Sequence, residues 1–312
     1  MTQEPANAID AKAIAFLARL DNAPQTEIVR AELETWLAED PRHRGAFLRA
    51  EAAFAHLDRL AILPVELSRP AFVSRRGLLI AGAGASALAA SAVGLALWLP
   101  TRNLIATPIG EIRRVPLNDG SVVAVNTNSE LGVDLKDNLR QLTLDKGEVW
   151  FDVAKDGKRP FVVAAGQVRV MAVGTAFSVR RRDDGADVLV TEGVVAAWAN
   201  GDVLNKVLVE AGSKVFVSDI AGPSRVTAAA HQIDRTLAWR NGQIALDGMS
   251  LGAAAAEFNR YNTRQLTIDP ALADKRLVGW FHTNEPETFA KAAAATLGVA
   301  LTENQDEIHL AP

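Results

Sequence analysis

An uninterrupted apolar run constrains this chain more than any other feature. Residues 77–99 read GLLIAGAGASALAASAVGLALWL and contain no charged side chain. As a helix the run spans roughly 34 Å, enough to cross a hydrocarbon core of about 30 Å. A buried soluble helix rarely needs so long an apolar stretch, and a cleavable signal peptide carries its apolar core nearer the N-terminus. The run therefore predicts a single transmembrane helix with a segment on either side of the membrane.

The charges beside this run indicate its orientation. Arg75 and Arg76 flank its N-terminal end and favour a cytoplasmic N-terminal side, although Arg113 and Arg114 follow not far beyond the other end. The stretch Ser74-Arg75-Arg76-Gly77-Leu78-Leu79 also looks like a twin-arginine export signal. The pattern leaves both interpretations open, an export signal or an ordinary positive flank. We expect an inner-membrane protein with a periplasmic C-terminus.

Length and composition bound the remaining possibilities. The 312 residues predict two or three domains. A net charge of −4 argues against a general affinity for nucleic acid. No cysteine occurs, and no two histidines stand at metal-ligand spacing, so the sequence predicts no disulfide, no metal site and no cofactor. Nucleophile-elbow, P-loop and zinc-protease motifs are also absent from the sequence, and we expect no enzymatic activity.

The residues before the apolar run have helical periodicity. Ile9, Ala13 and Phe16 recur three and four apart, and so do Val29, Leu33 and Trp36. Asp40 followed by Pro41 resembles a helix N-cap with proline at the first helical position, and Phe47 and Phe54 continue the pattern. The pattern predicts a small all-α bundle over residues 1–63 and a linker over residues 64–76. A bundle of this size is marginally stable, so either it suffices alone or a partner completes its core.

Beyond the membrane the apolar period changes from 3.6 to 2. Val168, Val170 and Ala172 alternate with Arg169 and Met171, and turn sequences such as Asn118-Asp119-Gly120 separate the runs. About ten short strands over residues 104–230 predict an all-β sandwich or barrel-like domain. Its lone carboxylates Glu148 and Glu192 adjoin turn glycines, and we expect both at strand ends on the surface.

The last segment, residues 232–312, repeats a mixed pattern. A strand is expected over Leu237 to Leu246, a helix capped by Ser250, and a strand over Arg264 to Ile268. A strand from Leu277 to His282, a helix opened by Pro286 and two short closing strands follow. The order predicts an α+β module of two β-α-β units. A module of this size without a ligand motif is more typical of docking to another protein than of catalysis.

Several stretches of the chain together resemble one known family, in that family's order and around one membrane helix. The stretches that carry the resemblance are Trp36-Leu37 with Asp40-Pro41-Arg42-His43-Arg44-Gly45-Ala46-Phe47, Gly147-Glu148-Val149-Trp150-Phe151-Asp152-Val153, Arg159-Pro160-Phe161-Val162-Val163, Ala172-Val173-Gly174-Thr175-Ala176-Phe177-Ser178-Val179, Ala238-Trp239-Arg240-Asn241-Gly242 and Glu257-Phe258-Asn259-Arg260-Tyr261-Asn262. These stretches resemble those of FecR-type anti-sigma factors. Two positions depart from the family pattern: Phe54 stands where Trp is expected, and Met249 stands where Pro is expected. The final module is similar to the short signalling domain of secretins and TonB-dependent transducers.

The resemblance implies a role in cell-surface signalling. The cytoplasmic helices would bind an extracytoplasmic-function sigma factor, and the periplasmic part would sense a TonB-dependent outer-membrane transducer, commonly in iron or siderophore uptake. Regulated proteolysis by membrane proteases would release the sigma factor. The implied sigma-binding candidates are Trp36, Leu37, Asp40, Pro41, Arg44, Phe47 and Phe54. The FecR-domain residues are Gly147, Glu148, Phe151, Val153, Pro160, Phe161, Gly174, Thr175 and Phe177, and the transducer-binding candidates are Trp239, Gly242, Phe258, Asn259, Tyr261 and Asn262.

Two other functions compete with this interpretation. A membrane-anchored periplasmic enzyme, or a carbohydrate- or ligand-binding protein, would carry convergent polar residues in the β domain, and the sequence offers none. A DNA-binding membrane regulator would have a basic N-terminal segment, yet residues 1–76 hold ten Lys and Arg against eleven Asp and Glu.

Overall fold

The structure, a computed structural model, describes residues 9, 12, 13, 16, 26–48, 103–199, 202 and 205–312. The expected transmembrane helix of residues 77–99 lies outside these residues, as do the linker, Phe54, Arg75 and Arg76. Within the described ranges, no helix has both the length and the apolar character that a bilayer crossing requires.

Within residues 26–48, the chain is helical where the periodicity predicted helices. Helix α2 (Thr26–Glu39) buries Val29, Leu33 and Trp36 on one face. A second helical stretch covers residues 41–48, and Asp40 caps it by accepting a hydrogen bond from the Arg42 backbone N–H at 2.8 Å. Ile9, Ala13, Phe16 and Ala46 complete this small core.

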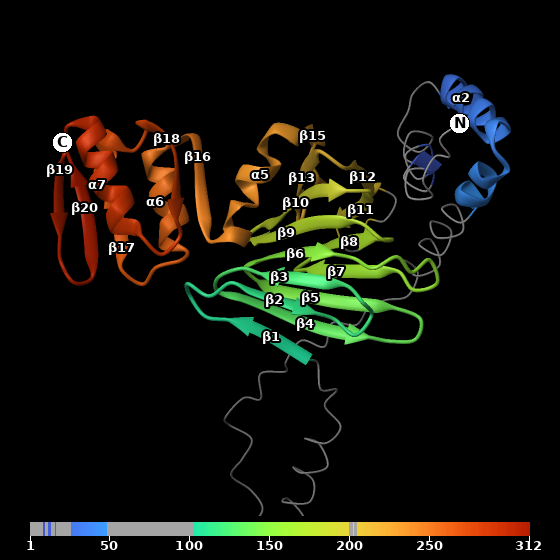
Figure 1. The fold of residues 1–312 in the computed structure, drawn as a ribbon, viewed down its shortest axis with the longest axis horizontal. Coiled ribbons are helices and arrows are strands. Elements are labelled where there is room, and N and C mark those ends of the chain that lie inside the picture. The colour runs from blue at the N-terminus through green and yellow to red at the C-terminus, as the bar shows by residue number, and fades with distance from the viewer. Residues whose placement is uncertain are drawn as a thin grey trace, which may run out of the picture.

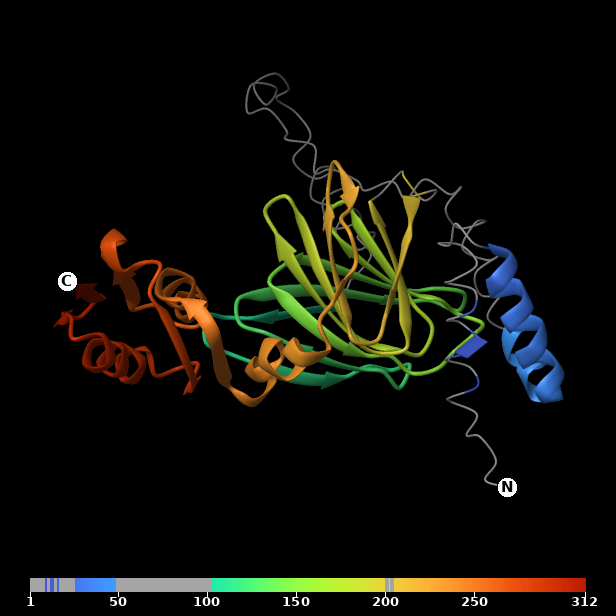
Figure 2. The same ribbon diagram turned by 90° about the horizontal axis from the view of Figure 1, so that it is seen from above.

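Residues 103–228 form two facing sheets, which confirms the all-β prediction (Figures 1 and 2). The first sheet has the order β1 (Asn103–Thr107), β4 (Ser129–Leu135), β5 (Arg140–Lys146), β7 (Phe161–Ala165), β8 (Val168–Ala172), β11 (Val194–Ala199) and β12 (Val207–Glu210). The second has the order β14 (Gly222–Pro223), β13 (Ser213–Ser218), β10 (Gly185–Glu192), β9 (Ala176–Arg182), β6 (Glu148–Asp152), β3 (Val122–Val125) and β2 (Arg113–Pro116), with β15 (Thr227–Ala228) beside β13. Neighbouring strands run antiparallel except for the parallel pair β5 and β7.

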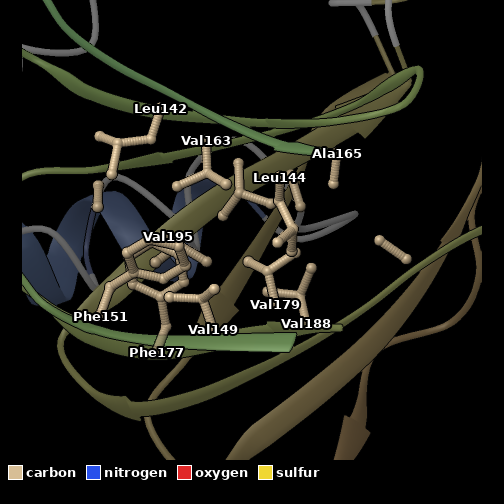
Figure 3. Close-up of a cluster of buried hydrophobic side chains, with 14 of the residues drawn as sticks. Leu142, Leu144, Val149, Phe151, Val163, Ala165, Phe177, Val179, Val188 and Val195 are labelled. Carbon is tan, nitrogen blue, oxygen red and sulfur yellow. The ribbon is translucent and has the colours of Figure 1, made fainter. Parts of the chain in front are cut away.

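The core lies between the two sheets, and Figure 3 shows part of it. The ring of Phe151 on β6 stacks on that of Phe177 on β9, with 5.1 Å between the ring centres. It also meets the ring of Phe161 on β7 edge-on, with 5.8 Å between the centres. The alternation of side chains along a strand explains which residues form this core, because every second residue of each strand points inward. Strand β8 thus sends Val168, Val170 and Ala172 into this core, while Met171 packs with Trp198 in a smaller cluster on the other face.

The C-terminal module follows the predicted β-α-β order twice. Its elements are η2 (Ala230–Gln232), α5 (Ile233–Thr236), η3 (Ala238–Asn241), β16 (Gln243–Ser250), α6 (Leu251–Asn259), β17 (Gln265–Ile268), η4 (Pro270–Leu272), β18 (Arg276–His282), α7 (Pro286–Leu297), β19 (Ala300–Glu303) and β20 (Glu307–Ala311). Strands β16 and β18 form an antiparallel pair, and β17, β20 and β19 form a second small sheet. Helix α6 buries Leu251, Ala254, Ala255 and Phe258, the spacing of one apolar helix face.

One predicted element of this module is wrong. The strand expected over Leu237 to Leu246 begins only at Gln243, because Ala238–Asn241 forms the 3₁₀ helix η3. Gly242 ends η3 in the left-handed conformation with φ of 70°, and its N–H bonds the Trp239 carbonyl at 2.8 Å. A glycine adopts this conformation without steric strain, so the chain turns there before it becomes extended.

Candidate functional site

The described residues converge most strongly where the C-terminal module meets the β-sandwich. Ala124 of β3 belongs to the same apolar cluster as Trp239, Phe258 and Tyr261 of the module. The Arg240 guanidinium lies 4.3 Å from the centre of the Trp150 ring on β6. Figure 1 shows the module at one end of the sandwich, beside these strands. We call this contact the module junction.

A buried carboxylate lies at the centre of the junction. Glu148 begins β6 directly after Gly147, whose φ of 88° turns the chain from β5 into β6. Glu148 is only 3% exposed, so the expectation of a surface carboxylate was wrong, whereas Glu192 is exposed as expected. The reason is tertiary, because the C-terminal module covers the strand end that would otherwise face solvent.

A network of ion pairs and hydrogen bonds surrounds Glu148. Its Oε2 lies 2.9 Å from Nη2 of Arg260 and accepts a hydrogen bond from Asn126 Nδ2 at 3.1 Å. The same Asn126 amide donates to the Tyr261 hydroxyl oxygen at 2.9 Å. Arg260 also pairs with Glu257 one helical turn earlier, and Arg180 of β9 donates to Glu257 at 3.1 Å. Positive and negative side chains of the sandwich and of the C-terminal module therefore alternate across the junction.

The surroundings of Glu257, Arg260 and Tyr261 shift the pKa values of all three. Burial by itself would raise the pKa of the Glu257 carboxyl, yet the charges and hydrogen bonds of Arg260 and Arg180 lower that pKa overall. Burial likewise opposes the charge of Arg260, but Glu257 and Glu148 raise its pKa above the ordinary value. Burial raises the pKa of Tyr261, so its hydroxyl stays neutral. The charges of Glu257 and Arg260 therefore stabilise each other inside the junction.

Several clefts border the network, and two of them share the Arg180–Glu257 pair. One, of about 400 Å³, is lined by Arg180, Trp239, Glu257 and Tyr261 among others, and the Trp239 indole N–H has no hydrogen-bond partner. The second, of about 380 Å³, shares Arg180 and Glu257 and adds Glu148 and Ser178. Within the described part of the chain, no group of three or more His, Asp or Glu side chains could hold a metal ion.

The predicted sigma-binding residues lie in different environments. Trp36 is buried, stacks on the His43 ring at 4.3 Å, and its carbonyl oxygen lies 2.7 Å from His43 Nδ1. Leu37 and Phe47 are partly buried against the same core. Asp40 caps the following helix, whereas Pro41 and Arg44 are exposed. The described surface available to a partner therefore includes Pro41 and Arg44 but not Trp36.

The residues predicted for the FecR domain act in its folding. Phe151, Val153, Phe161 and Phe177 are buried in the sandwich core. Gly147 and Gly174 have positive φ angles, and Thr175 is buried next to Gly174. Pro160 is partly buried and its carbonyl accepts the Arg140 backbone N–H at 3.0 Å.

The predicted transducer-binding residues mostly hold their own module together. Trp239 and Phe258 are core residues. Asn259 exchanges two hydrogen bonds with the backbone of Leu266, which attaches β17 to α6. Asn262 donates to the carbonyls of Phe258 and Thr283. Trp239, Phe258 and Tyr261 also share an apolar cluster with Ala124 of the sandwich, and the Tyr261 hydroxyl accepts a hydrogen bond from Asn126.

Sequence reasoning missed most of the junction. Asn126, Arg180, Glu257 and Arg260 were not among the candidate residues, although the stretch Glu257–Asn262 was singled out. The signal within that stretch was the Glu-to-Arg spacing of three residues, which places both charges on one side of a helix. Asn126 and Arg180 carry no comparable sequence signal, because their partners lie far away along the chain.

The fold defines a class of protein: a β-sandwich joined through a polar junction to a small α+β module. Residues 103–196 match the family model described as FecR protein, and residues 11–53 match the domain of unknown function DUF4880. These matches confirm the resemblance to FecR-type anti-sigma factors.

Solved structures share the fold. Two crystal structures of a candidate anti-sigma factor from Parabacteroides distasonis ATCC 8503, at 1.65 and 2.50 Å resolution, match with a TM-score of 0.56 and 21% sequence identity. Each match covers 67% of this chain, and 98% and 97% of the respective solved chains. At this identity the likeness concerns the fold. No curated protein matches the sequence.

Proposed function

We propose that the chain is a membrane-spanning anti-sigma factor that carries a periplasmic signal to a cytoplasmic sigma factor. The observation that carries this proposal is the order of the two family matches, residues 11–53 and 103–196, on either side of the apolar run 77–99. The solved structures with the same fold are described as a candidate anti-sigma factor, which also supports it. The function is regulatory and requires no catalytic residue or cofactor.

In this proposal the N-terminal helices, residues 1–63, bind an extracytoplasmic-function sigma factor in the cytoplasm. The described core around Trp36 is small, and such a core gains stability when a partner buries more of its surface. The exposed Arg44 and Leu48, the latter 56% exposed, follow Asp40 on one short helical stretch and are the proposed points of contact.

The periplasmic segments receive the signal. We propose that the C-terminal module binds the signalling domain of a TonB-dependent outer-membrane transducer, in iron or siderophore uptake. The module junction then transmits the bound state to the β-sandwich, which begins at Asn103, four residues after the apolar run. Proteolysis within the membrane would release the cytoplasmic segment with its sigma factor.

Co-purification tests the sigma-binding part. Residues 1–76 should retain an extracytoplasmic-function sigma factor from the same genome when both are produced together. Arg44→Glu should weaken retention without lowering the thermal stability of the segment, because Arg44 is exposed. Trp36→Ala should lower that stability by about 3–5 kcal/mol, the usual effect of truncating a buried aromatic side chain. Failure of every such sigma factor to co-purify would contradict the proposal.

A ligand-binding function is the second candidate, and the cleft beside Trp239 favours it. The indole N–H of Trp239 has no hydrogen-bond partner. Arg180 and Arg276 line the same cleft. An oligosaccharide or small anion bound there should raise the melting temperature of the periplasmic part. The rise should disappear in Trp239→Phe, which keeps an aromatic ring at this position but removes the N–H donor together with the pyrrole part of the indole.

A further inference from the structure

The first strand after the apolar run and the turn that follows it expose two large apolar side chains. Leu104 on β1 is 60% exposed, and Ile109 in the turn between β1 and β2 is 47% exposed. Leu104 points away from the sandwich core, because its neighbour Ile105 packs against that core and successive side chains of a strand alternate. Opposite Leu104 on β4 lies Gly132, which has no side chain to cover it. Both apolar side chains therefore face the surroundings of the sandwich.

Both sheets of the sandwich end at this place. Strand β1 is the last strand of the first sheet and β2 is the last strand of the second. Within the described residues, β1 pairs only with β4 and β2 only with β3. Figure 1 shows β1 and β2 along the same side of the sandwich. We call residues 103–118 the β1–β2 rim.

The position of the apolar run limits how far this rim can lie from a membrane. Only three residues separate Leu99, the end of the run, from Asn103, the start of β1. Four steps along the chain extend over at most about 14 Å. If residues 77–99 cross the membrane, as the proposed function requires, the start of β1 lies within that distance of the end of the crossing. The exposed apolar side chains Leu104 and Ile109 belong to the part of the sandwich that is tied to the bilayer.

The charge of the rim suits a phospholipid surface. Residues 103–118 contain two arginines, Arg113 and Arg114, and both are exposed. They contain one acidic residue, Glu111, whose carboxylate pairs with Arg113. The rim therefore carries an excess of positive charge, which anionic lipids attract.

The acidic side chains beside the rim do not reverse this balance. Glu130 and Asp134 flank Gly132 on β4, on the same face as Leu104. Glu130 pairs with Lys146 at 2.9 Å, and Asp134 pairs with Lys136 at 2.9 Å. Each carboxylate is thus matched by a lysine on the same surface.

We propose that the β1–β2 rim rests on the periplasmic surface of the membrane that residues 77–99 cross. Leu104 and Ile109 lie among the lipid headgroups, where they leave water, and Arg113 and Arg114 lie beside lipid phosphates. This contact holds the sandwich against the bilayer instead of leaving it to move freely on its three-residue connection. The inference rests on the proposed function, because it requires that function's membrane helix, and it adds a lipid-binding surface to it.

Fluorescence quenching by labelled lipids tests this contact. The chain has no cysteine, so Ala106→Cys provides a single labelling site, on the same side of β1 as Leu104. The full-length protein, labelled there with a fluorophore, is placed in nanodiscs of phosphatidylethanolamine and phosphatidylglycerol that carry spin labels on some headgroups. We expect strong quenching. The double variant Leu104→Ser with Ile109→Ser should reduce the quenching by about twofold or more, because interfacial binding scales with the apolar area buried.

The matched control is Ile220→Ser, which removes a 97% exposed apolar side chain between β13 and β14, at the opposite end of the second sheet from β2. It should leave the quenching unchanged. Equal quenching with and without the double substitution would overturn the proposal, since the short connection alone would then explain the proximity. A label that is shielded from water but not quenched by lipid would assign the rim to a protein partner, which also overturns it.

The failure of the proposed function would look different. Carbonate extraction of cell membranes shows whether the full-length chain is inserted. Release of the chain into the soluble fraction would contradict the membrane helix, and the proposed function would fail together with the lipid contact. A chain that stays inserted but whose quenching ignores the double substitution would leave the proposed function standing and remove only the lipid contact.

Discussion

At the scale of single residues, a fully buried ion pair holds one end of the sandwich. Arg140 on β5 and Asp119 in the β2–β3 turn are both shielded from solvent, with Nη1 and Oδ2 3.0 Å apart. Arg140 also donates to the carbonyls of Ala154 and Arg159 at 2.8 and 3.0 Å. Burial would raise the pKa of Asp119, but hydrogen bonds from Ser121 and Arg140 lower it overall. The pair therefore stabilises the fold only while Asp119 is ionised.

Asp119→Asn should reveal this dependence on pH. A carboxyl whose pKa is lowered on folding contributes stability above its unfolded pKa, and this contribution is lost as pH falls through the folded value. At pH 7 the variant of a soluble fragment of residues 103–312 should lose about 3–5 kcal/mol, because Arg140 keeps a buried, uncompensated charge. At pH values well below 3.8 the difference should shrink. Urea denaturation at both pH values measures it, and a difference that stays constant would contradict the assignment.

A substitution of Arg260 tests the contact between the C-terminal module and the sandwich. Arg260 pairs with Glu148 of the sandwich, so Arg260→Met should loosen the contact between the modules and cost about 2–4 kcal/mol. Hydrogen exchange should then accelerate around Glu148 and Asn126. The control is Arg264→Met, because Arg264 pairs with Glu287 and Glu303 inside the C-terminal module. Equal protection of the junction in both variants would show that Arg260 does not hold it.

At the scale of elements, periodicity predicted those whose apolar faces repeat regularly. The stripes of α2, α6 and the sandwich strands could be read from the sequence because one face of each packs on a core. The 3₁₀ helix η3 could not be predicted in this way, because its four residues are too few to show a periodic pattern. Trp239 also suits a strand as well as it suits such a helix. Glu148 was misassigned for a related reason, because its burial depends on Arg260, more than a hundred residues away.

The turn between β5 and β6 requires a glycine at position 147, and this requirement can be tested. Gly147 has a φ of 88°, and a Cβ there would lie 2.0 Å from Ser129 Oγ. Gly147→Ala should therefore destabilise the fragment by about 2–4 kcal/mol, through backbone strain and displacement of Ser129. Gly157→Ala is the matched control, since no atom lies within 4 Å of its added Cβ. Similar melting temperatures for both variants would contradict this role of Gly147.

At the scale of the whole molecule, the proposed function depends on a membrane between the two family matches. The two matches are residues 11–53 and 103–196, and the apolar run 77–99 lies between them. The sequence predicted the order of the parts, whereas the junction between the last two emerged only from the structure. That junction packs the C-terminal module against strands β3 and β6 of the sandwich.

Reporter fusions test this arrangement directly. The paired Arg75 and Arg76 before the apolar run predict that residues 1–76 face the cytoplasm and residues beyond 99 the periplasm. A phosphatase that is active only in the periplasm should therefore work when fused after residue 110 and stay inactive when fused at residue 70. Replacing both arginines by Asn should reduce the activity of the first fusion if they orient the helix. Activity at residue 70 and none after residue 110 would reverse the topology, and the sigma-binding segment would then lie on the wrong side of the membrane.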